Sequence, residues 1–343
     1  MGRVLLPVLL TRRNVLVLTG ASLLGGLVLT LSPELGFSRS GGNAPAPALA
    51  APKTSSALAL MPTDADLPRS GDGRHYPLLP SDSKELAALL AALEEAIRNP
   101  NTREADLPRL AHQQQVIYRV LSHRRLLADQ VRAALPPRWH PVFDHHVGAR
   151  REFLAMHRGQ RSLTLPSWRI IPPKPAEQLL AYYREAAAAT GIPWEVLAAV
   201  NLVETGMGRV DGISVAGAQG PMQFLPSTWA QAGIGKGNIR DPQDAIGAAA
   251  RYLVRRGGPA NLKKALWGYN NSDHYGKAVL HYAALMKEDP SAFRGLYHWE
   301  VHFASGAGDL WLPVGYLQPT PISVAAYLKT HPASAPPPGS SGY

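Results

Sequence analysis

A single carboxylate at the end of an apolar helix is the feature of this chain that most constrains its fold. Residues 193–206 read Pro-Trp-Glu-Val-Leu-Ala-Ala-Val-Asn-Leu-Val-Glu-Thr-Gly, which predicts a helix that begins at Pro193 and ends before Gly206. Glu204 continues the apolar face formed by Leu197 and Val200. Burial and the helix dipole both disfavour a negative charge there, so we expect a raised pKa for Glu204 and a role as general acid.

Two further segments favour this interpretation over an ordinary surface glutamate. Residues 214–229 read Ser-Val-Ala-Gly-Ala-Gln-Gly-Pro-Met-Gln-Phe-Leu-Pro-Ser-Thr-Trp, and residues 266–272 read Leu-Trp-Gly-Tyr-Asn-Asn-Ser. The glycines and prolines around Gln223 indicate a closely packed backbone that offers the glutamine amide to a polar ligand. Tyr269 and Asn270 add a phenol and an amide, which suit the hydroxyl and N-acetyl groups of sugars.

The three segments, taken in order, resemble the lytic transglycosylases of the lysozyme-like superfamily. Residues 216–227 look most like the membrane-bound lytic transglycosylase B subtype, and the resemblance covers about residues 175–290. It implies a lysozyme-like fold of the goose-type and transglycosylase group. It also implies non-hydrolytic cleavage of the β-1,4 bond between N-acetylmuramic acid and N-acetylglucosamine in peptidoglycan, leaving 1,6-anhydromuramoyl ends. The expected partner is therefore the peptidoglycan glycan strand.

The resemblance also assigns roles to single residues. Glu204 matches the catalytic acid and base of the family. The positions that match its substrate-binding residues are Ser214, Gln223, Tyr252, Tyr269 and Asn270. Thr205 stands where many relatives have serine, but it keeps the hydroxyl group.

We expect no metal and no cofactor. Some relatives carry an EF-hand-like calcium loop, but residues 233–240 read Gly-Ile-Gly-Lys-Gly-Asn-Ile-Arg and lack its acidic ligands. The chain has no cysteine, which excludes disulfides and cysteine-ligated metals. His140, His145 and His146 fall in one predicted helix, where we expect solvated side chains rather than metal ligands.

Composition divides the mainly α-helical chain into five predicted segments. Residues 1–31 form a signal peptide or a retained membrane anchor, because three arginines precede an uncharged apolar run at residues 14–31. Residues 32–80, rich in Pro, Ala, Ser and Gly, form a disordered linker. A small helical accessory region follows at 81–160. The lysozyme-like domain with a C-terminal extension occupies 161–321, and 322–343 form a tail.

The net charge of +10 is spread along the chain, without a recognisable nucleic-acid motif. We expect a monomer that binds no nucleic acid and is exported to the periplasm or cell wall, with the N-terminal segment cleaved or kept in the membrane. Ordinary glycosidases use two carboxylates, and this sequence offers one near the predicted site. Two alternatives stay open, a hydrolytic muramidase on the same fold and a non-catalytic wall-binding scaffold.

Overall fold

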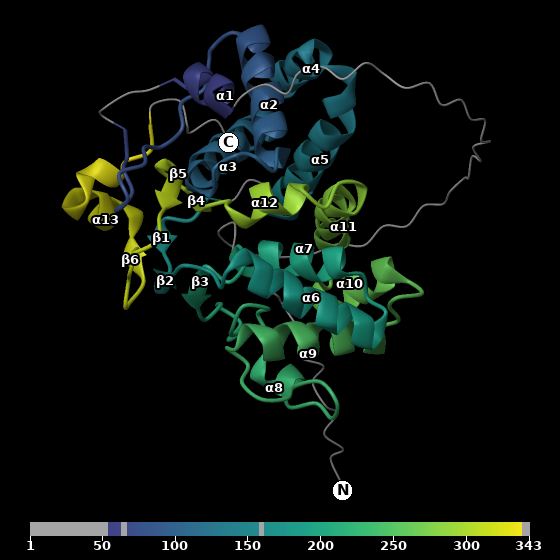
Figure 1. Ribbon diagram of the computed structural model, residues 1–343. Helices are drawn as coiled ribbons and strands as arrows, with labels where there is room; N and C mark the ends of the chain where they lie inside the picture. The colour runs from purple at the N-terminus through teal and green to yellow at the C-terminus, as the bar shows by residue number, and fades with distance from the viewer. Residues whose placement is uncertain (1–53, 63–66, 158–160, 338–343) are drawn as a thin grey trace, which may run out of the picture.

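The computed structural model describes residues 54–62, 67–157 and 161–337, and within these ranges it is mainly α-helical, as predicted (Figure 1). The helices of the N-terminal half are α1 (Thr54–Leu60), α2 (Ser83–Arg98), α3 (Leu107–His123), α4 (Arg125–Ala134) and α5 (His140–His157). Those that follow are α6 (Ala176–Thr190), α7 (Trp194–Thr205), α8 (Pro226–Trp229), α9 (Pro242–Arg255), α10 (Leu262–Asn270), α11 (Asp273–Glu288), α12 (Ala292–Tyr297) and α13 (Val324–Thr330).

The predicted signal or anchor at residues 1–31 lies outside the described residues. Among the helices of the described ranges, none combines the length and the apolar character that crossing a bilayer requires.

Local chemistry accounts for the helix ends that the sequence predicted. The Asp82 carboxylate accepts hydrogen bonds from the first backbone amides of α2, from Lys84 N at 2.8 Å and Glu85 N at 3.0 Å. Asp241 caps α9 in the same way. Helices α6 and α7 end in left-handed glycines, where the residue that follows the helix has a φ of 74° at Gly191 and 61° at Gly206.

The region predicted as a separate accessory unit, 81–160, shares one hydrophobic core with the helices that follow it. Helix α5 packs along α11, and α11 packs in turn on α7. In Figure 1, α11 and α12 lie between the blue helices α2–α5 and the green helices α6–α10. One core thus includes side chains from the helices on both sides of the predicted boundary at residue 160. Without α5, the apolar side of α11 that faces it would be exposed to solvent.

Three short antiparallel pairs of strands form a second core beside the helices. They join β1 (Thr164–Leu165) to β6 (Ile322–Ser323), β2 (Trp168–Ile170) to β3 (Val210–Gly212), and β4 (Val301–Ser305) to β5 (Gly308–Leu312). One prediction is corrected here, because the tail expected at 322–343 contributes β6 and α13. Residues 164–170, at the start of the predicted lysozyme-like domain, contribute β1 and β2. Both segments fold because they bury apolar side chains in this core, among them Leu165, Ile170, Val324 and Tyr327.

The disordered linker predicted at 32–80 is folded over part of its length. Ala57 of α1 and Met61, which follows this helix, pack in the main core. Further along, Tyr76 is buried beside Val116 and Trp311, and its hydroxyl donates to Asp309 Oδ2 at 3.0 Å. Composition did not predict these contacts, because it is averaged over the whole segment. A few apolar residues are enough to order part of a polar segment when they pack on a core formed by other elements.

The solvated histidines predicted in α5 are corrected at one position. His146 is buried, lies stacked on Tyr118 at 4.1 Å between ring centroids, and burial lowers its pKa well below the usual value. His145 is half-buried and contacts His281 and Glu288, and His140 contacts the carbonyl of Leu135. No metal-binding group of histidines and carboxylates occurs within the described ranges.

A core substitution in α2 tests whether the two halves unfold together. Leu90 is fully buried, so Leu90→Ala should cost about 2–5 kcal/mol of unfolding free energy. Hydrogen exchange should then speed up in α7 as well as in α2, because both helices belong to one core. Leu126→Ala, at a leucine on α4 that is 81% exposed, is the control and should change little. Unchanged protection of α7 in Leu90→Ala would show that residues 81–160 unfold independently.

Candidate active site

Helix α7 carries Glu204 in its last turn and is buried on all sides. Every residue from Val196 to Thr205 is buried, because α6, α9 and α11 all pack against this helix. The sequence analysis anticipated one apolar face, whereas the helix lies inside the core, as an almost continuous apolar segment should. Glu204 therefore sits at the point where a core helix meets a pocket.

Glu204 is 3% exposed, and its Oε1 accepts a hydrogen bond of 2.8 Å from the hydroxyl of Tyr275. Burial raises the pKa of Glu204 to about 8, and the hydrogen bond from Tyr275 opposes that rise in part. No cation of the described residues pairs with the carboxylate to favour its charge. The direction predicted from the sequence is confirmed, with burial as the cause. The group is protonated near neutral pH, as a general acid requires.

Tyr275 is the main residue of the site that the sequence analysis missed. It lies in the first turn of α11, is fully buried, and stacks parallel to Tyr269 at 6.2 Å between ring centroids. In the sequence it continues the apolar stripe of Val279, Tyr282 and Met286, which indicates only a core position. Its contact with a side chain 71 positions earlier has no local signal.

All six site residues predicted from the sequence line one pocket. Its walls come from the end of α7, the loop between β3 and α8, and the helices α8, α9 and α10. The lining residues are Glu204, Ser214, Ala216, Ala218, Gln223, Phe224, Leu225, Thr228, Tyr252, Tyr269 and Asn270. The structure thus brings the six residues together, while the role of each remains a prediction.

The glycine-rich loop, residues 214–225 between β3 and α8, is shaped by backbone contacts. Ser214 Oγ accepts from Ala218 N at 3.0 Å, and the backbones of the same two residues form a second bond of 3.0 Å. Gly220 has a φ of 74°, and a Cβ atom there would lie 2.0 Å from Ile239 O. Only glycine fits this position. The close backbone packing expected from the sequence is therefore confirmed, and the segment that packs against Gly220 is the backbone of Ile239.

Gln223 carries two signs of a functional residue. Its φ of 48° places a non-glycine residue in the left-handed region, which costs free energy unless the surroundings impose it. Its Nε2 donates to Gly220 O at 3.0 Å, while its Oε1 is buried without a hydrogen-bond partner in the described residues. A buried acceptor without a partner indicates a place where a ligand donates.

The three side chains from α9 and α10 have different hydrogen-bonding states. The Tyr269 hydroxyl donates to Met222 O at 2.8 Å, so it holds the loop. The Tyr252 hydroxyl accepts from Arg256 Nη2 at 2.9 Å. Asn270 is 7% exposed, and its amide makes no hydrogen bond within the described part of the chain. Gln223 and Asn270 therefore retain polar groups for a ligand, and the two tyrosines contribute ring surface.

A buried polar network ties the loop to α7. Thr205 Oγ1 and Asn201 Nδ2 both donate to Pro221 O, at 2.6 and 2.8 Å. The Tyr183 hydroxyl donates to Asn201 Oδ1 at 2.6 Å and so orients the amide. The Thr205 hydroxyl, which a serine would also supply, thus stabilises the loop by binding Pro221 O. The sequence analysis did not identify Asn201 as part of this network. A polar residue in an apolar helix is visible in the sequence, but its partners are not.

Among the residues that the structure describes, Glu204 is the one carboxylate that lines its pocket. Asp211, which is near in sequence, binds Arg169 and Arg240 on the surface. Asp241 caps α9, and Asp244 accepts from the backbone amide of Asn238. The pocket therefore offers one titratable acid surrounded by amide, hydroxyl and aromatic groups.

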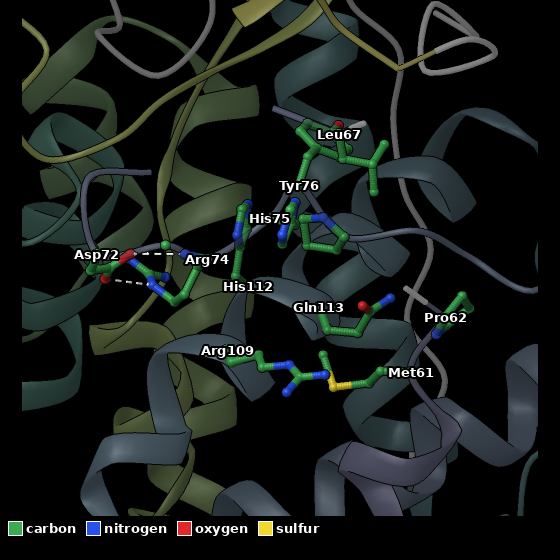
Figure 2. Close-up of a pocket in the computed structure, with 12 residues that line it drawn as sticks. Met61, Pro62, Leu67, Asp72, Arg74, His75, Tyr76, Arg109, His112 and Gln113 are labelled. Carbon is green, nitrogen blue, oxygen red and sulfur yellow. Dashed lines mark hydrogen bonds and ion pairs between the residues drawn. The ribbon is translucent and has the colours of Figure 1, made fainter. Parts of the chain in front are cut away.

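A larger pocket of about 520 Å³ lies elsewhere, between α3 and the residues 61–62 and 67–77 (Figure 2). It shares no lining residue with the Glu204 pocket. Its carboxylate, Asp72, is exposed and is held by Arg74 through a hydrogen bond of 2.7 Å, which Figure 2 shows as a dashed line. A solvated carboxylate paired with arginine stays ionised, so Asp72 is not a proton donor comparable to Glu204.

Comparison with known proteins agrees with this geometry. Residues 181–284 match the family model described as "Transglycosylase SLT domain". The matched range contains Glu204, Tyr275 and the other residues of the pocket. No curated protein and no solved structure matches the chain. The match and the helical architecture support a lysozyme-like fold and a lytic transglycosylase-type domain that acts on peptidoglycan.

Proposed function

We propose that the protein is a peptidoglycan lytic transglycosylase that cleaves the β-1,4 bond between N-acetylmuramic acid and N-acetylglucosamine. The observation that carries this proposal is the buried carboxyl group of Glu204, the single carboxylate among the described residues of a pocket that also presents amide, hydroxyl and aromatic groups. The family match at 181–284 supports the substrate class.

The chemistry follows from a single carboxyl group that serves twice. Protonated Glu204 donates its proton to the glycosidic oxygen as the bond to the muramoyl C1 breaks. The resulting Glu204 carboxylate then takes the proton of the C6 hydroxyl of the same sugar as the C6 oxygen bonds to C1. The product is a 1,6-anhydro ring, and no water is consumed. Glu204 ends protonated and ready for another cycle.

The neighbouring groups suit binding of the reacting sugars. The free Oε1 of Gln223 can accept from a hydroxyl or an acetamido N–H, and the Asn270 amide can both donate and accept. Tyr275 acts through Glu204 as a positioning residue, because its hydroxyl holds Oε1 and leaves the other oxygen to carry the proton. Ser214, Tyr252 and Tyr269 shape the pocket around them.

We also propose that the protein acts outside the cytoplasm, in the periplasm or cell wall, since that is where peptidoglycan lies. The predicted signal or anchor at 1–31 supports export. The division of the chain at residues 31, 80, 160 and 321 stays a proposal, within which the helices of residues 81–157 pack in one core with those that follow.

The reaction products decide between this function and its two alternatives. Digested sacculi should yield 1,6-anhydromuramoyl fragments, each lighter by one water than the fragment that a hydrolytic muramidase would release. Mass spectrometry of the soluble fragments measures this difference. Hydrated ends would assign the protein to the muramidases, and sacculus binding without any release would assign it to the wall-binding scaffolds.

Glu204→Gln should abolish turnover. The amide keeps the shape of the side chain but cannot transfer a proton, so fragment release should fall at least 10²–10⁴-fold, the typical contribution of general acid–base catalysis, while binding to sacculi persists. Glu195→Gln, on the first turn of the same helix, is the matched control and should keep full activity. Turnover in Glu204→Gln near the wild-type rate would move the catalytic role to another residue.

The raised pKa of Glu204 should appear in two pH profiles. Turnover needs the protonated acid and should decline as pH rises through about 8. The folded pKa of about 8 lies above the ordinary 4.5, so the folded state is increasingly penalised between these values as pH rises. Glu204→Gln lacks this penalty, so its stability relative to wild type should increase over the same range. Denaturant unfolding at pH 5 and pH 9 checks this, and a constant difference would contradict the raised pKa.

Asn270 and Tyr269 should respond differently to substitution. Asn270→Ala removes an amide that has no internal partner, so turnover should fall about tenfold or more with little change in melting temperature. Tyr269→Phe leaves Met222 O without its donor, so it should cost about 1–3 kcal/mol of stability as well as activity. Both quantities are measured on the same preparations. A large loss of stability in Asn270→Ala would show that the residue is structural.

A further inference from the structure

An exposed leucine lies among arginines at the corner where α3 ends and α4 begins. Arg124 is the single residue between the two helices, and Arg125 and Leu126 are the first residues of α4. Both arginines are exposed, and Leu126 is 81% exposed, whereas Val131 of the same helix is buried in the core. We call these three residues, together with Arg151 of α5, the α4 corner.

Arg151 brings a further positive charge to this corner from α5. Its Nε donates to Ser122 O, in the last turn of α3, at 3.3 Å. Burial and then the charge of Arg125 lower the pKa of Arg151, and the opposite charge of Asp129 counteracts them in part. The two guanidinium groups are therefore close enough to repel each other, and an anion placed beside both would relieve this repulsion.

Within the described residues, Arg125 and Arg151 form no ion pair with a carboxylate, in contrast to an arginine at the other end of α4. There, Arg132 donates to both oxygens of Asp144, in two hydrogen bonds of 2.7 Å. The charges of Arg125 and Arg151 are therefore available to an anion outside the chain.

We propose that the α4 corner docks on a lipid bilayer that contains anionic headgroups, with Leu126 inserted at the boundary between headgroups and acyl chains. Arginines at such a surface are attracted to the lipid phosphates, and an exposed leucine between them gains by leaving water. A soluble polyanion would also bind the arginines, but the leucine favours the bilayer because only the bilayer offers it an apolar environment. This inference concerns where the protein is held and does not depend on the reaction at Glu204.

Docking at the α4 corner would orient the Glu204 pocket. In Figure 1, α4 lies at one end of the molecule, and α8 and α9, which contribute walls of the pocket, lie at the other. A bilayer at α4 would therefore leave the pocket at the end far from the membrane. For an exported protein that acts on peptidoglycan, this orientation directs the site toward the cell wall.

Fluorescent labels at the two ends of the molecule test this docking. The chain has no cysteine, so Gln130→Cys on α4 and Ser227→Cys on α8, both at exposed positions, each give the full-length protein a single labelling site. Each protein carries a polarity-sensitive fluorophore and is titrated with vesicles of phosphatidylcholine, alone or mixed with phosphatidylglycerol. The label at 130 should shift to the blue with the anionic vesicles only, and the label at 227 should not shift. Because the readout is local, it separates the α4 corner from the predicted signal or anchor at 1–31.

Substitutions in the labelled Gln130→Cys protein identify the groups that bind. Arg125→Gln should require about fivefold more anionic lipid for half of the shift, the factor expected for one arginine at a charged membrane surface. Leu126→Ser should require about tenfold more or beyond, because the inserted apolar side chain is lost. Lys329→Gln, which removes an exposed charge from α13, is the matched control and should bind as the parent protein does. Unchanged melting temperatures show that each variant is folded.

The absence of a shift at 130 with anionic vesicles would overturn the proposal. An equal shift with phosphatidylcholine alone, or an equal shift at 227, would also overturn it, because binding would then be independent of charge or of orientation. If Leu126→Ser binds the anionic vesicles as tightly as the parent, the corner acts through charge alone. That result would reject the bilayer in favour of a soluble polyanion such as polyphosphate.

Discussion

The site depends on keeping one carboxyl group out of water. Glu204 stays protonated near neutral pH because α6, α9 and α11 enclose the helix that carries it and no cation of the described residues pairs with it. The hydrogen bond from Tyr275 offsets only part of the rise in its pKa. Helix α11, which supplies Tyr275, is itself packed along α5. By supporting α11, the N-terminal helices therefore help to keep Glu204 buried and protonated, although none of their residues lines the pocket.

The loop around Gln223 shows how polar groups are divided between structure and function. Pro221 O receives Thr205 and Asn201, and Met222 O receives Tyr269, so the two carbonyls before Gln223 are fixed by buried donors. This fixation holds Gln223 in its left-handed conformation with Oε1 unpaired. A rigid loop that leaves an acceptor unused is preorganised for a ligand, because little conformational entropy remains to be lost on binding.

Local patterns in the sequence predicted helices such as α2, α7 and α9, and the family resemblance supplied the six residues that line the pocket, but neither revealed contacts that join distant segments. Capping by Asp82 and termination at Gly206 are decided within a few residues, so they could be predicted. The pairing of β1 with β6 joins residues 164–165 to 322–323, and two-residue strands have no periodicity to detect. The contact of Tyr275 and the burial of His146 were not predicted for the same reason, because both depend on residues that are distant in the sequence.

The β4–β5 hairpin contacts the end of α7, the helix that carries Glu204, and it is held in place by buried histidines whose charge affects stability. Val301 in β4 lies against Gly206 at the end of α7, 3.9 Å from where a Cβ atom would stand. The hairpin is held to α3 by a buried chain in which Asp309 binds His302, and His302 contacts His112 at 2.9 Å. Burial lowers the pKa of both histidines below 6.5, so the folded state is penalised as pH falls below that value. Glu204 penalises it as pH rises from 4.5 toward 8, so the two effects oppose each other between pH 4.5 and 6.5, and these three groups together favour the folded state most in that interval.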